Sequence, residues 1–207
     1  IERDFRFINN NFICSNTKAG AIESKVETHV LIDICNFVSC TVKSEYENGG
    51  AINFINCGMK CVRSDFIVCT STTDGKGGRI YIQINTSIHE DSLIKDCTFT
   101  GCSAIYGGGA YVYSNVKTKL ISFKKCTFTK NSVIESKENE EESSGSALYL
   151  ITAKSIVIRC KFVNNEGVNS IKIVQDFENE IENNAIILNN EIKSVVIEDS
   201  SFEINSR

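Results

Sequence analysis

Charged side chains recur just before and within a series of short segments that each contain a phenylalanine. They are Arg63, Asp65, Asp96, Lys125, Arg159 and Lys161. Carboxylates beside cations are the groups with which lyases and hydrolases of polysaccharides hold a metal ion, transfer protons or polarise a uronic acid. The set therefore raises the hypothesis of an enzyme that acts on a polysaccharide. Its alternating signs favour a different interpretation, ion pairs between neighbouring strands, which need no catalysis.

Cysteine is the second residue type that could bind a metal or form covalent bonds, and the chain contains ten. Seven stand at two fixed distances from a phenylalanine: Cys35, Cys97, Cys126 and Cys160 two residues before one, and Cys40, Cys69 and Cys102 three residues after one. Such columns predict thiols packed in a core, and disulfides between neighbours are the alternative. Cys57 and Cys61, with His29 and His89 as the two histidines, do not form a zinc-binding pattern. We expect no metal site and no cofactor.

Composition limits the class of protein. The 207 residues, 42% hydrophobic and 23% charged, suit one soluble globular domain. The net charge of −4 argues against a nucleic-acid-binding surface. No apolar run reaches the roughly 18 residues that a membrane span needs. The start at Ile1 without a methionine suggests a segment of a longer protein.

Two motifs alternate along the chain with a period of about thirty residues. The first is a phenylalanine followed three residues later by Asn or Cys, as in Phe7/Asn10, Phe37/Cys40, Phe66/Cys69, Phe99/Cys102, Phe128/Asn131, Phe162/Asn165 and Phe202/Asn205. The second is the tetrapeptide Gly49, Gly50, Ala51, Ile52, with variants that continue as far as Asn183–Ile186. This regularity predicts a repeat architecture with one structural unit per period.

The segments between these motifs alternate hydrophobic and polar residues with period two, as in the stretch from Ile80 to Ile84, and lack helical periodicity. Each repeat therefore predicts one coil of a parallel β-helix, a solenoid of about seven coils. In this arrangement the phenylalanines stack inside and the glycines form a corner where neighbouring coils approach closely. We expect a single domain over residues 1–207, with loop insertions at 132–145 and 166–184.

The two alternating motifs resemble the repeat of the polymorphic membrane protein family of surface proteins. The strict Phe-x-x-Asn form occurs four times, beginning at Phe7, Phe128, Phe162 and Phe202, and the strict Gly-Gly-Ala-Ile form once, at Gly49. The chain departs from the pattern where Cys replaces Asn, where Arg79 replaces Ala, and where asparagines replace the last pair of glycines. The resemblance implies a single-stranded right-handed parallel β-helix of pectate-lyase-like architecture, an extracellular or cell-surface location, and no catalytic residues.

The same resemblance implies adhesion to host cells, with a host-surface protein or glycan, or further coils of the same protein, as partner. We therefore expect a non-catalytic role in adhesion or surface architecture, with a polysaccharide-acting β-helix enzyme, a lyase or glycosidase, as the alternative. Two surfaces are candidates for binding. One is an outward column containing Tyr81, Val112 and Tyr149, which could instead be a covered row of strand-forming residues. The other is the acidic run with Glu138, Glu140, Glu141 and Glu142, which could equally be a solvated loop.

Overall fold

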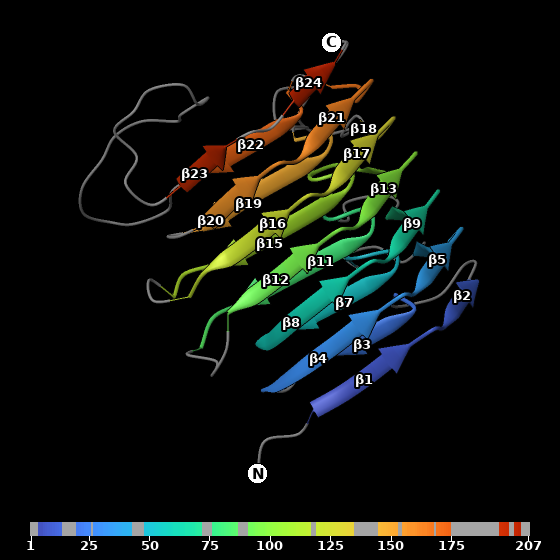
Figure 1. Cartoon of the computed structure of the whole chain (residues 1–207), viewed down its shortest axis with the longest axis vertical. Coiled ribbons are helices and arrows are strands. Elements are labelled where there is room, and N and C mark those ends of the chain that lie inside the picture. Colours follow the sequence, from blue (N-terminus) through green and yellow to red (C-terminus); the bar gives the residue numbers. More distant parts are fainter. Residues whose placement is uncertain are drawn as a thin grey trace.

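The computed structural model describes residues 4–13, 20–25, 27–42, 48–71, 76–86, 91–116, 119–134, 145–152, 155–167 and 169–174, and the backbone of 195–198 and 201–203. Within these ranges the chain winds through four parallel sheets, so that strands far apart in sequence lie side by side (Figure 1). The predicted parallel β-helix is confirmed. Two of the sheets contain seven strands, with one strand from each coil.

Sheet A and sheet B are the two seven-stranded sheets. Sheet A consists, in spatial order, of β1 (Asp4–Ile8), β4 (Thr28–Asp33), β8 (Cys57–Val62), β12 (Ser92–Lys95), β16 (Ile121–Lys124), β20 (Ser155–Ile158) and β23 (Val195–Glu198). Sheet B carries the phenylalanine motif and consists of β2 (Asn11–Ile13), β5 (Asn36–Val38), β9 (Asp65–Ile67), β13 (Thr98–Thr100), β17 (Thr127–Thr129), β21 (Lys161–Val163) and β24 (Ser201–Glu203).

Sheet C and sheet D complete each coil. Sheet C was not predicted, and its strands are only two residues long: β6 (Thr41–Val42), β10 (Thr70–Ser71), β14 (Ser103–Ala104) and β18 (Ser132–Val133). Sheet D begins after the glycine corner and consists of β3 (Ile22–Ser24), β7 (Ile52–Ile55), β11 (Ile80–Ile84), β15 (Ala110–Ser114), β19 (Leu148–Thr152) and β22 (Ile171–Val174). Figure 1 shows sheets A and B running side by side along the length of the solenoid.

The phenylalanines form a continuous stack inside sheet B. The rings of Phe12, Phe37, Phe66, Phe99, Phe128 and Phe162 follow one another with centroids 4.5 to 5.0 Å apart and interplanar angles of at most 10°. From Phe37 to Phe162 these side chains are fully buried. This stacking follows from the strand spacing of a parallel sheet, because in-register side chains repeat at nearly the contact distance of aromatic rings.

The first phenylalanine of this stack is Phe12 and not Phe7, which the repeat motif predicts. Phe7 pairs in register with Ile32 of sheet A, whereas Phe12 pairs with Phe37. Asn10 is exposed, and its amide donates locally to the Ile8 carbonyl. Phe7 and Asn10 therefore do not belong to the phenylalanine and asparagine columns. A turn at Asn9, with φ of 57°, separates Phe7 from Phe12.

The position three residues after each phenylalanine is a buried polar column. The Asn131 side-chain oxygen accepts from the Cys102 amide (3.1 Å), and its Nδ2 donates to the Phe99 carbonyl (3.2 Å). Asn165 repeats this pattern, since it accepts from the Asn131 amide and donates to the Phe128 carbonyl. The cysteines use sulfur in the same way, with the Cys69 amide 3.1 Å from Cys102 Sγ. This column therefore satisfies backbone groups at a buried corner, as predicted for the asparagines.

The nine described cysteines are all buried as thiols, in agreement with the prediction of packed thiols. Cys14, Asn205 and the side chain of Phe202 lie outside the described residues, although the Phe202 backbone pairs with Phe162. Among the residues described, no helix has the length and apolar character needed to cross a membrane.

The predicted insertions fall partly within the solenoid. Ser132 and Val133 form β18, and residues 171–174 form β22, where Ile171 and Ile173 pair with Leu148 and Leu150. The prediction of a loop over 166–184 is therefore wrong for residues 171–174, because their period-two pattern matches the inward column of β19. Residues 135–144 and 175–184 lie outside the described residues.

Candidate functional site

A shallow groove crosses the outer face of sheet A over strands β4, β8 and β12. Its volume is about 530 Å³, and it is lined by Leu31, Asp33, Lys60, Val62, Arg63, Leu93, Lys95 and Asp96. Two registered rows form its floor: Leu31, Lys60 and Leu93, and then Asp33, Val62 and Lys95. Alternation along each strand places these residues outward, because the intervening residues, such as Ile32, Cys61 and Ile94, are buried in the core.

The corner at the end of these strands brings Arg63 and Asp96 into the groove. Both residues have positive φ, 48° and 53°, as do Ile34, Lys125 and Arg159 at the equivalent corners of other coils. This left-handed conformation turns the chain sharply between sheet A and sheet B. The corner therefore presents the side chain of one residue per coil beside the last outward residue of sheet A.

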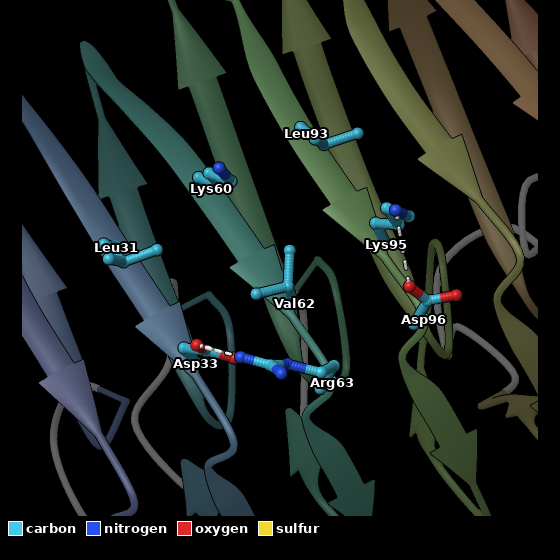
Figure 2. Close-up of a pocket in the computed structure, with 8 residues that line it drawn as sticks. All are labelled: Leu31, Asp33, Lys60, Val62, Arg63, Leu93, Lys95 and Asp96. Carbon is cyan, nitrogen blue, oxygen red and sulfur yellow. Dashed lines mark hydrogen bonds and ion pairs between the residues drawn. The ribbon is translucent and has the colours of Figure 1, made fainter.

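Arg63 forms an ion pair with Asp33 across the groove. Arg63 Nε donates to Asp33 Oδ1 at 2.9 Å, and Nη2 donates to Oδ2. Figure 2 shows the guanidinium reaching back from its corner to the neighbouring strand. Asp33 raises the pKa of Arg63, first through these hydrogen bonds and then through its charge. The Asp33 side chain is 17% exposed and that of Arg63 58%, so the pair closes one side of the groove while remaining in contact with solvent.

The second carboxylate of the groove is also beside a cation. Lys95 Nζ lies 3.7 Å from Asp96 Oδ2, and both side chains are more than 40% exposed (Figure 2). The alternating charges from Arg63 to Lys161 predict ion pairs within that set, but the short contact of Arg63 is with Asp33. No feature of the sequence indicates this partner, which lies 30 residues before Arg63.

Cations continue from the groove toward the later coils. Lys95 pairs in register with Lys124. Lys125 and Arg159 follow Asp96 at the corner, and Lys161 begins the next strand of sheet B. On the outer face of sheet A, at its corner and at the start of sheet B, the charged residues described over these three coils are five cations, Lys95, Lys124, Lys125, Arg159 and Lys161, and one carboxylate, Asp96. We call this surface the basic ridge. It lies on a chain whose net charge is −4.

The predicted tyrosine column lies on the outer face of sheet D, with one change. Tyr81 pairs in register with Tyr111, and Tyr111 with Tyr149. Adjacent rings stack at 5.4 Å, and Val112 lies fully buried in the core. The outward placement of Val112 was wrong by one residue. Because Gly107, Gly108 and Gly109 are consecutive, the glycine motif can be aligned in two ways, and a shift of one residue exchanges the two faces of a strand.

The tyrosine column is not an open surface. Tyr81 is 6% exposed and Tyr111 4%. Lys76 Nζ lies 5.2 Å from the Tyr111 ring centre, and Tyr106 packs edge-on against Tyr149. Burial raises the pKa of Tyr111 above its ordinary value. Of the two alternatives for this column, the covered row of strand-forming residues agrees with the structure. The acidic candidates Glu138, Glu140, Glu141 and Glu142 lie outside the described residues.

Comparison with known proteins adds no functional assignment. No family model, no curated protein and no solved structure matches this chain. In the part of the chain that the structure describes, no three His, Cys, Asp or Glu side chains are grouped so as to hold a metal ion.

Proposed function

We propose that this protein is a non-catalytic β-helix of a cell surface or secreted protein that acts in adhesion, and that it binds anionic glycans along the groove and the basic ridge. The observation that carries this proposal is the excess of cations over carboxylates among the described residues of the basic ridge, on the coils that contain Lys95, Lys124 and Arg159, within a protein of net charge −4. In a protein of net charge −4, such a local group of cations attracts an anionic ligand.

The solenoid geometry suits an extended ligand. Coils repeat about every 4.8 Å, so cations at the same position of successive coils form a straight row. A linear polysaccharide with carboxylate or sulfate groups can follow such a row and contact several cations at once. Individually weak surface contacts then add along the polymer.

Binding fits the groove better than proton transfer does. Asp33 is held by two hydrogen bonds from Arg63, and Asp96 lies beside Lys95. A general acid or base needs a carboxylate whose pKa is tuned to its task and which is directed at the substrate. Both carboxylates are instead directed at neighbouring cations, and we expect Lys124 and Lys125 of the ridge to contact a ligand. The resemblance to the polymorphic membrane protein repeat supports adhesion by analogy only.

The proposal is tested by retention of the purified chain on immobilised heparin and polygalacturonate, with product release followed in parallel. We expect retention that weakens as salt is raised, because screening shortens the range of surface charges. The double variant Lys124→Glu/Lys125→Glu should lose most of the retention. Lys130→Glu is the matched control, since Lys130 is an exposed lysine at the next corner, beyond the phenylalanine strand.

Equal retention of both variants, or no retention of the wild type, contradicts binding on the ridge. Shortened or unsaturated product that depends on Asp33 or Asp96 supports the enzymatic alternative instead.

A further inference from the structure

Two cysteines lie in contact with each other directly below the groove. Cys61 stands between Lys60 and Val62 on β8, and Cys97 follows Asp96 after the corner of the next coil. Their sulfur atoms are 3.8 Å apart, and the two residues are 0% and 1% exposed. Residues that line the groove therefore flank both members of a buried thiol pair, on two adjacent coils (Figure 2).

The place of Cys61 is an exception within sheet A. In the same row the neighbouring coils have Ile32 and Ile94, and both are fully buried. Cys61 points into the core as they do, because Lys60 and Val62 on either side of it face the groove. A thiol thus stands in a row of large aliphatic side chains, at the end of the strand that lies beside the corner.

The cysteine column that precedes the phenylalanines makes the complementary exception. Cys35 and Cys97 stand two residues before a phenylalanine, and Ser64 has this position in the coil between them. The backbone ladder runs through all three, since the Asp65 amide donates to the Cys35 carbonyl and the Thr98 amide to the Ser64 carbonyl. The coil that lacks a thiol in the column is therefore the coil that has one in the strand, and this thiol reaches Cys97 diagonally across the corner.

We propose that Cys61 and Cys97 are the site of a disulfide, formed when the chain folds in an oxidising environment, that fastens together two coils of the groove. An S–S bond is about 2.0 Å long, so the sulfurs have to approach each other by about 1.8 Å. Rotation of two short side chains provides such a movement. The structure itself contains the reduced pair, because Cys97 Sγ lies 3.2 Å from the Lys95 carbonyl oxygen, which accepts a hydrogen bond from a thiol.

The oxidant is a low-molecular-weight disulfide of the glutathione type. One protein thiol loses its proton, and its thiolate attacks a sulfur of the oxidant, whose S–S bond breaks to release one glutathione. The second protein thiolate attacks the protein sulfur of this mixed disulfide and releases the other glutathione. The protein loses two electrons, the oxidant gains them, and the two protons end on the released thiols. Since both sulfurs are buried in the closed coil, the exchange takes place during folding or local opening.

The bond would stabilise the folded chain. Its partners are 36 residues apart in sequence, so the bond closes a loop in the unfolded chain and lowers the entropy of that state. We therefore expect the oxidised protein to have a thermal midpoint higher than that of the reduced protein by about 5 °C or more.

The test is refolding of the whole 207-residue chain in a buffer of reduced and oxidised glutathione. Remaining thiols are alkylated in denaturant, and the chain is digested with trypsin without reduction and analysed by mass spectrometry. The bond joins the peptide of residues 61–63 to the peptide of residues 96–117, and we expect this linked pair in most of the protein. Reduction before digestion should abolish it. The thermal midpoint is measured on the same two preparations.

Two variants assign the bond. Cys61→Ala should remove both the linked pair of peptides and the rise in thermal midpoint. Cys102→Asn is the matched control, because Cys102 lies on the same tryptic peptide as Cys97 and the next coil has Asn131 at the equivalent position. This variant should keep the linked pair and the rise.

Alkylation of both Cys61 and Cys97 in the refolded wild type overturns the proposal, and so does a bond from Cys97 to Cys126 in place of Cys61. An oxidised wild type that melts no higher than the reduced protein contradicts the fastening of the coils. These outcomes need no folded variant. Retention on heparin is a separate measurement, so failure of glycan binding leaves the test of the disulfide unaffected, and the reverse holds as well.

Discussion

Replacing Asn131 by alanine should destabilise the protein strongly, because this buried side chain links three coils. Its amide group accepts from the Cys102 amide and donates to the Phe99 carbonyl and to Asn165 Oδ1. Each hydrogen bond contributes about 0.5–1.5 kcal/mol net, and the buried donor left at Cys102 adds its desolvation cost. We therefore expect the free energy of unfolding to fall by about 3 kcal/mol.

A cysteine at the same position should recover much of this loss. Cys69 and Cys102 already occupy equivalent positions, where sulfur accepts from a buried amide at 3.1 Å and donates to the phenylalanine carbonyl of the previous coil. Asn131→Cys keeps both partners with weaker bonds, so we expect a loss of about 1 kcal/mol. Asn36→Ala is the control, because the Asn36 amide makes an exposed hydrogen bond to Asn11 and its loss should cost less than about 0.5 kcal/mol.

Urea denaturation, followed by circular dichroism, measures all three variants against the wild type. The slope of the free energy with urea should stay constant if the same surface is exposed on unfolding. The reasoning is refuted if Asn131→Ala loses no more than Asn36→Ala. It is also refuted if Asn131→Cys is no more stable than Asn131→Ala, since the sulfur would then not replace the amide.

Four further changes test the corners and the groove. Val68 is a β-branched residue with φ of 51° and is 54% exposed, so Val68→Asn should raise the thermal midpoint, corresponding to about 1 kcal/mol. Gly101→Val, the reverse change at the same corner of the next coil, should lower it. Gly50→Ala would place Cβ 2.5 Å from the Gly78 carbonyl oxygen, so we expect a loss of more than about 2 kcal/mol in urea denaturation. Asp33→Asn removes a solvent-accessible ion pair and should change stability by less than about 1 kcal/mol, with a smaller difference at high salt; a larger loss would show that the pair is a structural requirement.

The architecture could be predicted from the sequence because its signals repeat. A large inward residue in every coil, as at Phe37, Phe66 and Phe99, aligns the coils without knowledge of any other contact. The prediction failed at two places where the repeat motif can be aligned with the other coils in two ways. Phe7 and Phe12 both point inward near the start, and the asparagine after Phe7 favoured the wrong one. Because three consecutive glycines precede Ala110, Val112 was assigned to the outer face of its strand, whereas it is buried in the core.

The groove could not be predicted, because its main contact depends on side-chain reach rather than on spacing. Asp65 lies two residues from Arg63 in sequence and belongs to the next strand of the same coil. The corner at Arg63 turns its side chain back toward β4, so the guanidinium meets Asp33 of the preceding coil (Figure 2). Only the left-handed backbone at this corner decides between the two carboxylates, and most residue types give no sequence signal for that conformation.

The position of Arg79 shows how a departure from a repeat can be compensated by its neighbours. A long cation at a corner that otherwise takes alanine needs both volume and charge compensation. The next coil has Gly109 at this corner, where even a Cβ would lie 2.5 Å from the Ala147 carbonyl oxygen. Burial lowers the pKa of Arg79, and the neighbouring thiols of Cys102, Cys69 and Cys40 act against this lowering. The exceptions at Arg79, Cys69 and Cys102 therefore form one local unit, and we expect Arg79→Ala to lower the free energy of unfolding less when Cys69 and Cys102 are also replaced by asparagine.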